Sequence, residues 1–232
     1  MKKYNPIFAL PLFFTCIPVY AGGYIEVREA WNSASEEHQL KLGAGYNFKN
    51  GAGLIYQSAF NTGKNLDQLK HSFDEIEGWY PVWKITNDLT LYGGGLINST
   101  KSGSTTAPYV QLGYVATPDF AVAFKYKYNH MNYMTTNLIG TMDYNDNHQL
   151  IIVANYKISN ILSYEFEPNL YINTADYNRK NGKDHSWELN HKLTWKMTQA
   201  WRPFIQLSWL DRDNKNHAEQ IRIRLGIRYY FQ

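Results

Sequence analysis

The sequence contains almost no cysteine and, beyond its N-terminal segment, no long apolar run. Its single cysteine, Cys16, lies in a stretch that we expect to be removed, so disulfides, thiolate chemistry and cysteine metal sites are excluded from the mature chain. No later segment reaches the length of about 18 apolar residues that a membrane helix needs. This absence excludes helical spans but permits the strands of a membrane barrel, whose lumen-facing half is polar.

An excess of one charge is missing as well. The chain has 23 basic and 20 acidic residues, so removing Lys2 and Lys3 leaves 21 against 20. The basic residues alternate with apolar ones, which argues against a nucleic-acid surface. Glycine-rich loops suited to phosphate binding and histidines at metal-ligand spacing are also lacking. We therefore expect no cofactor and no metal.

The N-terminus is typical of a secretory signal peptide. Lys2 and Lys3 precede an apolar stretch over residues 7–17, and Val19-Tyr20-Ala21 provides small residues for signal peptidase just before Gly22. We expect residues 1–21 to be removed and residues 22–232 to form a single domain outside the cytoplasm.

The last twelve residues alternate without a break between two faces. The apolar face carries Ile221, Ile223, Leu225, Ile227, Tyr229 and Phe231, and the other face carries Arg222, Arg224, Gly226, Arg228 and Tyr230. Only a strand gives this period of two. Three arginines opposite an apolar face favour a transmembrane barrel strand, with lipid on one side and a wet, positively charged lumen on the other.

The whole mature chain is consistent with an all-β transmembrane antiparallel barrel of twelve strands. The predicted strands are 23–32, 37–48, 52–62, 70–83, 89–98, 107–116, 119–130, 146–157, 161–173, 185–197, 201–210 and 219–231. Short connections alternate with longer polar ones, such as 98–106 and 131–145, which predicts short periplasmic turns and longer external loops. We expect a bend or bulge at Gly93-Gly94-Gly95 and a bulge at Pro168.

Five segments carry a resemblance to a known family: 22–32, 75–81, 94–98, 164–168 and 209–212, read as GGYIEVREAWN, EIEGWYP, GGLIN, YEFEP and WLDR. They resemble the oligogalacturonate-specific porin (KdgM) family, and within it most closely the OmpL-type porins. The resemblance implies a monomeric outer-membrane channel for passive diffusion of small hydrophilic solutes, small sugars or acidic sugars among them. It also implies contact with outer-membrane lipid and with the barrel assembly machinery. By position, the family's lumen-arginine role falls on Arg28, Arg222, Arg224 and Arg228.

The alternation of inward and outward residues along each predicted strand, here called strand phase, independently predicts which charged side chains face the lumen. The inward basic residues are Arg28, Lys41, Lys125, Lys127, Lys192, Lys196, Arg202, Arg222, Arg224 and Arg228, and the inward acidic ones are Glu26, Glu75, Glu77, Glu165, Glu167 and Glu188. The excess of ten over six predicts a weakly anion-favouring pore. Its predicted solute-contacting residues are Arg28, Arg222, Arg224, Arg228, Arg202, Lys41, Lys125 and Lys127, opposed by Glu75 and Glu77. Guanidinium groups bind carboxylates, and a column of them spreads the affinity along the path.

Four other interpretations remain open at this stage. In the first, the arginines pair with lumen glutamates and only fill the barrel. In the second, the lumen is plugged and the barrel has a structural or adhesive role. A lipolytic enzyme would need a serine beside a lipid-facing histidine. His191 has that orientation, but Ser208 has the opposite phase. A soluble sandwich would place Trp187 and Trp195 in its core instead of at two membrane interfaces.

Overall fold

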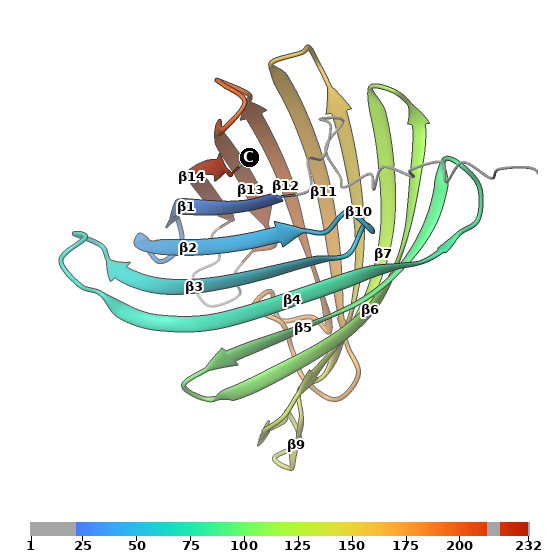
Figure 1. Ribbon diagram of the computed structural model, residues 1–232. Coiled ribbons are helices and arrows are strands. Elements are labelled where there is room, and N and C mark those ends of the chain that lie inside the picture. The colour runs from blue at the N-terminus through green and yellow to red at the C-terminus, as the bar shows by residue number, and fades with distance from the viewer. Residues whose placement is uncertain (1–21, 213–218, 232) are drawn as a thin grey trace, which may run out of the picture.

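The computed structural model describes residues 22–212 and 219–231, so the predicted signal peptide lies outside the described residues. The chain forms a closed antiparallel barrel of twelve strands, as predicted (Figure 1). The barrel strands are β1 (Gly22–Asn32), β2 (Glu37–Asn47), β3 (Gly53–Gly63), β4 (Lys70–Lys84), β5 (Leu89–Thr100), β6 (Gly103–Thr117), β7 (Phe120–Met131), β10 (Asn147–Lys157), β11 (Leu162–Asn173), β12 (His185–Trp195), β13 (Trp201–Leu210) and β14 (Gln220–Tyr230). Two short strands, β8 (Met134–Thr136) and β9 (Met142–Tyr144), form a separate hairpin beyond one rim.

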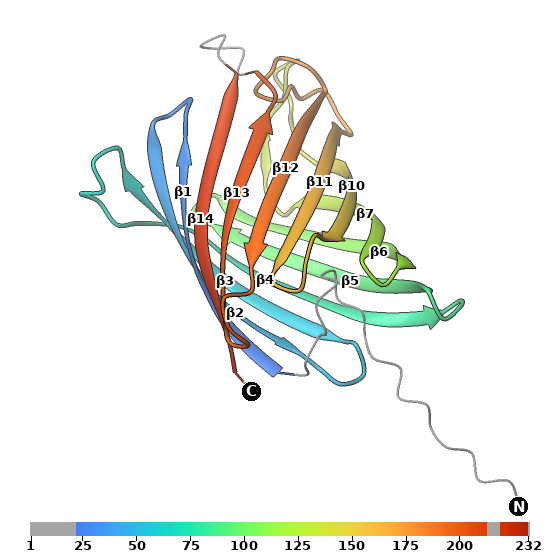
Figure 2. The ribbon, with the colours of Figure 1, turned by 90° about the horizontal axis from the view of Figure 1, so that it is seen from above.

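The first and last strands close the sheet. β1 pairs with β14 from Tyr24 opposite Tyr230 to Asn32 opposite Arg222, without a register shift. Figure 2 shows β14 between β1 and β13. Because each remaining barrel strand pairs with its sequence neighbour, with β7 joined to β10 across the hairpin, no barrel strand is left with a free edge.

Burial is inverted relative to a soluble protein. Outward side chains such as Ile25, Leu42 and Ile205 are 43 to 47% exposed, whereas inward amides such as Gln149 and Asn169 are 4% and 3% exposed. An apolar outer surface and a polar interior suit a barrel surrounded by lipid. Among the described residues, no helix is long and apolar enough to cross a membrane.

The predicted strand ends lie within two residues of the observed ones, with one exception. β6 begins at Gly103 instead of residue 107, so the predicted long connection over 98–106 is wrong: only residues 101–102 join β5 to β6. The serine and threonine residues of this segment are typical of a polar loop. They continue the ladder instead, with Ser99 opposite Ser104 and Thr100 opposite Gly103, because β-branched threonine favours strands.

The predicted bulge at Pro168 is also wrong. Pro168 lies opposite Leu189 of β12 in an unbroken register. On its other side, the pairing of β10 with β11 skips positions 152 and 153 and resumes in the same register. Proline lacks an amide hydrogen, so it interrupts one ladder locally without adding a residue to the strand.

The three glycines of β5 lie beside a bulge on the neighbouring strand. The register of β4 and β5 shifts between Pro81 and Trp83, opposite Tyr92 and Leu91. The irregularity expected near Gly93 is therefore carried by β4, while Gly93, Gly94 and Gly95 remain paired in sequence with Tyr80, Trp79 and Gly78.

Inward aromatic rings lie directly over glycines of adjacent strands. A Cβ atom on Gly94 would fall 2.3 Å from the Tyr109 ring, and one on Gly226 would fall 2.3 Å from the Phe204 ring. Comparable overlaps join Gly45 with Tyr24 and Gly53 with Trp79. These glycines therefore provide the depth that lets large rings lie flat along a narrow lumen.

We expect Gly94→Ala to destabilise the barrel by about 1 to 3 kcal/mol, since overpacking displaces a buried ring. Tyr109 is only 6% exposed and holds the Lys125 ammonium 4.2 Å from its ring centre, so it has little room to move. Gly95→Ala is the matched control, because its Cβ meets nothing closer than 4.0 Å. Urea unfolding in detergent, followed by tryptophan fluorescence, measures both. Equal midpoints would contradict the packing argument.

The topology prediction is tested with two lysines in turns at opposite ends of the barrel. Lys49 lies between β2 and β3 and Lys101 between β5 and β6, and both are exposed. With short turns in the periplasm, a bulky maleimide should label Lys101→Cys on intact cells and Lys49→Cys only after permeabilisation. Both should react in detergent. The reverse pattern on intact cells would invert the topology.

Candidate functional site: the charged lumen

The arginines of β14 form a column along the lumen wall. Arg222 lies opposite Asn32 of β1, Arg224 opposite Ala30, and Arg228 opposite Glu26. Arg28 lies opposite Gly226, in the gap between Arg224 and Arg228. The alternation of β1 and β14 therefore brings together the four arginines to which the sequence assigned the pore role.

Two of these arginines share one carboxylate. Glu188 Oε1 lies 3.3 Å from Arg222 Nη1 and 3.6 Å from Arg224 Nη2. Arg222 Nε also donates to Asn32 Oδ1 at 2.7 Å, while Arg224 Nη1 donates to Ser208 Oγ at 3.0 Å. Both guanidinium groups are thus held against the wall by protein acceptors, as the pairing interpretation expected.

Arg228 is held by a carboxylate and two phenol rings. Its Nε donates to Glu26 Oε2 at 3.0 Å, its Nη1 donates to the Tyr230 hydroxyl at 3.2 Å, and its guanidinium lies 4.4 Å from the Tyr24 ring centre. Arg202 stacks on the other aromatic partner, 4.1 Å from the Tyr230 ring centre. This end of the column is a packed, charge-compensated cluster.

Arg28 and Lys41 differ from the rest of the column. They lie directly opposite each other on β1 and β2, and within the described residues neither makes an ion pair or a side-chain hydrogen bond. Both line a cavity of about 150 Å³, together with Lys192, Arg228 and Glu26. Arg228 pairs with Glu26 and Lys192 pairs with Glu165, so Arg28 and Lys41 give this chamber its positive potential.

The facing part of the wall carries a second group of charges, on β4 and β7. Lys125 Nζ lies 3.2 Å from Glu77 Oε1, although β5 and β6 separate their strands. Glu75 accepts a hydrogen bond of 3.3 Å from Asn98. For Lys127, the described part of the chain offers no ion pair. The two predicted glutamates are therefore engaged, and Lys127 is a cation without an ion pair among the described residues.

The long connections on one side of the mouth are tied together. Asp146, just before β10, accepts hydrogen bonds from His130, Tyr128 and the Met131 amide at 2.7 to 2.9 Å. Burial acts to raise the pKa of Asp146, but these hydrogen bonds outweigh it, so the pKa is lowered. The carboxylate is thereby kept ionised and holds the outer ends of β7 and β10 together.

Several contributors to the site escaped the sequence analysis. The bridging role of Glu188 depends on a contact across β13 that strand phase alone does not specify. Tyr24 and Tyr230 have the correct phase, but nothing in the sequence marked them as arginine platforms. Arg179, which lines the mouth, lies in a connection without periodicity, so no sequence signal indicated it.

The residues considered for enzymatic chemistry lie on opposite faces. His191 contacts lipid-facing aromatics: its Nδ1 lies 2.6 Å from the Tyr164 hydroxyl, and its ring centre lies 4.9 Å from that of Phe166. Ser208 is fully buried in the lumen network, where its hydroxyl donates to Asn190. Within residues 22–212 and 219–231, no cluster of three or more histidine, cysteine or acidic residues could hold a metal ion.

Comparison with known proteins gives a consistent result. Residues 15–231 match the family model described as "Oligogalacturonate-specific porin protein (KdgM)". The chain is 23% identical over 227 residues to the N-acetylneuraminic acid outer membrane channel protein NanC of Escherichia coli K12, covering 95% of each. It is 24% identical over 220 residues to the oligogalacturonate-specific porin KdgM of Dickeya dadantii, covering 88% of this chain and 89% of that protein.

Solved structures agree on the fold. The NanC porin superposes with a TM-score of 0.82 at 23% identity, over 89% of this chain and 100% of that one. The KdgM porin superposes with a TM-score of 0.68 at 20% identity, over 90% and 99%. The finer placement beside the OmpL-type branch stays a prediction.

We expect Glu188→Gln to increase the preference for anions, since it releases two arginines from their shared countercharge. The glutamine keeps the size and one acceptor of the glutamate. A free charge about 6 Å from a passing ion is worth about 0.7 kcal/mol in water, so the permeability ratio should change by roughly threefold. Reversal potentials across a salt gradient measure this ratio.

Glu36→Gln is the control for that measurement. It removes the same charge from an exposed rim position, where Glu36 pairs with Lys64 at 2.7 Å outside the lumen. Its reversal potential should match that of the wild type. A Glu188→Gln potential equal to the wild-type value would mean that Arg222 and Arg224 do not act on passing ions.

Proposed function

The chain belongs to the KdgM family of oligogalacturonate-specific porins, and from that premise we propose passive diffusion of small hydrophilic solutes, acidic sugars favoured, through a weakly anion-favouring lumen. The protein is an outer-membrane porin with a twelve-stranded barrel. Its family relatives are channels, for N-acetylneuraminic acid in one case and oligogalacturonate in another. Both of those solutes carry carboxylates, which is the charge that a basic lumen attracts.

The observation that carries the proposal is the pair formed by Arg28 and Lys41. Two cations face each other across β1 and β2 without a carboxylate partner among the described residues, and both line the narrow chamber of about 150 Å³. Their charges are available to a solute, whereas those of Arg222, Arg224 and Arg228 are partly compensated by glutamates. We therefore assign the larger part of the selectivity to Arg28 and Lys41.

The expected preference is modest. Lumen water screens each charge, and the salt of a physiological solution limits its range to about 8 Å. Engaged carboxylates such as Glu77 and Glu188 lie along the same path. Weak attraction distributed over several positions lets a solute bind and leave again, which passive flux requires.

Two cavities along the lumen, of about 500 and 150 Å³, favour an open channel over a plugged adhesive barrel. A non-enzymatic role is favoured by the separation of His191 from Ser208 onto opposite faces. The proposal also includes a monomeric state and insertion by the barrel assembly machinery, in line with a sheet that closes within one chain. Migration of the folded protein in detergent tests the monomeric state.

We expect the double variant Arg28→Gln and Lys41→Gln to lose most of the anion preference, because it removes two cations that have no ion pair among the described residues. The matched variant Arg222→Gln and Arg224→Gln removes the same charge from positions held by Glu188, so its reversal potential should also shift toward cations, but less. Planar bilayer recordings in a salt gradient measure both, and heat-modifiable migration on a gel checks folding.

Liposome swelling provides the solute readout. Wild-type protein should admit galacturonate faster than the Arg28 and Lys41 double variant does, while galactose should enter equally through both. If the two double variants gave the same reversal potential as the wild type, the lumen cations would be structural and pore size alone would determine which solutes pass.

A further inference from the structure

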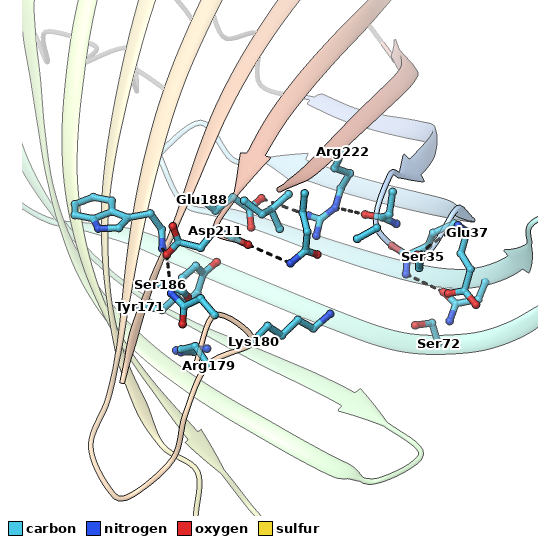
Figure 3. A pocket seen from close by; sticks show the side chains of 18 residues that line it. Ser35, Glu37, Ser72, Tyr171, Arg179, Lys180, Ser186, Glu188, Asp211 and Arg222 are labelled. Carbon is cyan, nitrogen blue, oxygen red and sulfur yellow. Dashed lines mark hydrogen bonds and ion pairs between the residues drawn. The ribbon is translucent and has the colours of Figure 1, made fainter. Parts of the chain in front are cut away.

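A second and larger cavity lies at the barrel end where the long connections meet (Figure 3). Its volume is about 500 Å³, and it is lined by the β11–β12 connection, the outer ends of β13 and β14, and residues around the β1–β2 connection. Ligand pockets commonly measure about 300 to 1,000 Å³. The cavity therefore has room for a small saccharide.

The β11–β12 connection is anchored. Tyr177 is only 7% exposed, and its hydroxyl lies 2.7 Å from the carbonyl oxygen of Thr135 and 2.6 Å from that of Asp143, both in the β8–β9 hairpin. The Tyr177 carbonyl accepts a hydrogen bond of 2.7 Å from Asn173. These contacts fix the backbone just before Arg179 and Lys180, which line the cavity from the same connection (Figure 3).

Two of the three acidic residues that line the cavity are engaged by the protein. Asp211 accepts hydrogen bonds from Asn181 at 2.9 Å and from the Trp187 amide at 2.7 Å, and Glu188 pairs with Arg222. Arg179 and Lys180 have no ion pair in the described part of the chain. Glu37, the remaining acid of the lining, lies on the side of the cavity toward β2 (Figure 3). The residues of the β11–β12 connection that line the cavity therefore carry two positive charges and no negative one.

Two nitrogen atoms of the Arg179 guanidinium group have no hydrogen-bond acceptor among the described residues. Its carbon lies 4.9 Å from the centre of the Tyr171 ring, and within the described residues its Nε and Nη2 atoms are buried without a partner. These two atoms form the edge that grips a carboxylate through two parallel hydrogen bonds. Buried donors without acceptors are unfavourable. Binding of a carboxylate to this edge is therefore favourable when the Arg179 side chain rotates away from the Tyr171 ring.

The rest of the cavity suits the hydroxyl groups of a sugar. Its lining includes neutral hydrogen-bonding side chains from six elements or connections: Asn32, Ser35, Gln39, Asn61, Ser72 and Gln220. Arg222 also lines it, and Arg222 is the outermost member of the β14 column. The cavity is thus continuous with the basic path through the lumen.

We propose, on the basis of the function proposed above, that this cavity is an entrance subsite in which Arg179 and Lys180 capture the carboxylate of an acidic sugar before it moves to Arg222. Carboxylate recognition lies on the β11–β12 connection, and the hydroxyl groups are bound by the neutral side chains opposite. The subsite raises the local concentration of acidic solute at the mouth without adding to the ion selectivity of the narrow chamber.

Single-channel recording of the full mature protein, with galacturonate as the probe, tests this subsite. Galacturonate should transiently block the wild-type current, and equimolar galactose should block it less. Arg179→Gln should raise the half-blocking concentration of galacturonate about tenfold, the loss expected for a charge-assisted pair. Arg179→Lys keeps the positive charge but loses the pair of parallel donors of the guanidinium group. Its half-blocking concentration should lie between those of the wild type and Arg179→Gln.

Lys183→Gln is the matched control, because Lys183 lies in the same connection, is exposed and does not line the cavity. Its half-blocking concentration should equal the wild-type value. Equal values for Arg179→Gln and Lys183→Gln, or equal block by galactose and galacturonate, would overturn the subsite. Reversal potentials measured in salt without sugar distinguish the subsite from the proposed anion preference of the lumen. Arg179→Gln should keep the anion preference of the wild type. A wild type without any anion preference would refute the lumen proposal and not the subsite.

Discussion

Closure of the sheet by β1 and β14 is the constraint on which the rest of this structure depends. A lipid bilayer offers no partner for a backbone amide or carbonyl, so a sheet can cross it only as a closed cylinder. In a closed sheet, each side chain points either toward the lipid or toward the lumen. Because the side-chain period of a strand is two, successive residues face the lipid and the lumen alternately. The charged column of β14 is a direct result, since its arginines lie two or four positions apart.

That period also explains what could be predicted from the sequence. Strand number, strand phase and nearly all strand ends follow from alternation, and so does the grouping of Arg28 with the β14 arginines. Pairing across the lumen could not be predicted, because Glu188 reaches Arg222 over β13, and Glu77 reaches Lys125 over β5 and β6. The polar residues of segment 98–106 predict a loop, although they continue the strands β5 and β6. The β8–β9 hairpin could not be predicted, because its connection has no periodic alternation of apolar and polar residues.

The lumen contains two kinds of cation. Those bound to glutamates, such as Arg228 with Glu26, stabilise the wall, since breaking such a pair leaves an uncompensated charge. Arg28, Lys41 and Lys127 have no ion pair in the described part of the chain and are half-buried. In the proposed function, the paired cations give a rigid wall, and the cations without an ion pair among the described residues give a weak attraction for anions.

The aromatic rings that lie over glycines have a consequence for the size of solute that the barrel admits. Tyr24 and Phe204 both line the narrow chamber, and each rests on a glycine of the neighbouring strand. A side chain at either glycine would lift the ring from the wall toward the centre of the passage. The width of this chamber therefore depends on Gly45 and Gly226, which do not line it, and a single methyl group beneath either ring would narrow it without altering any charge.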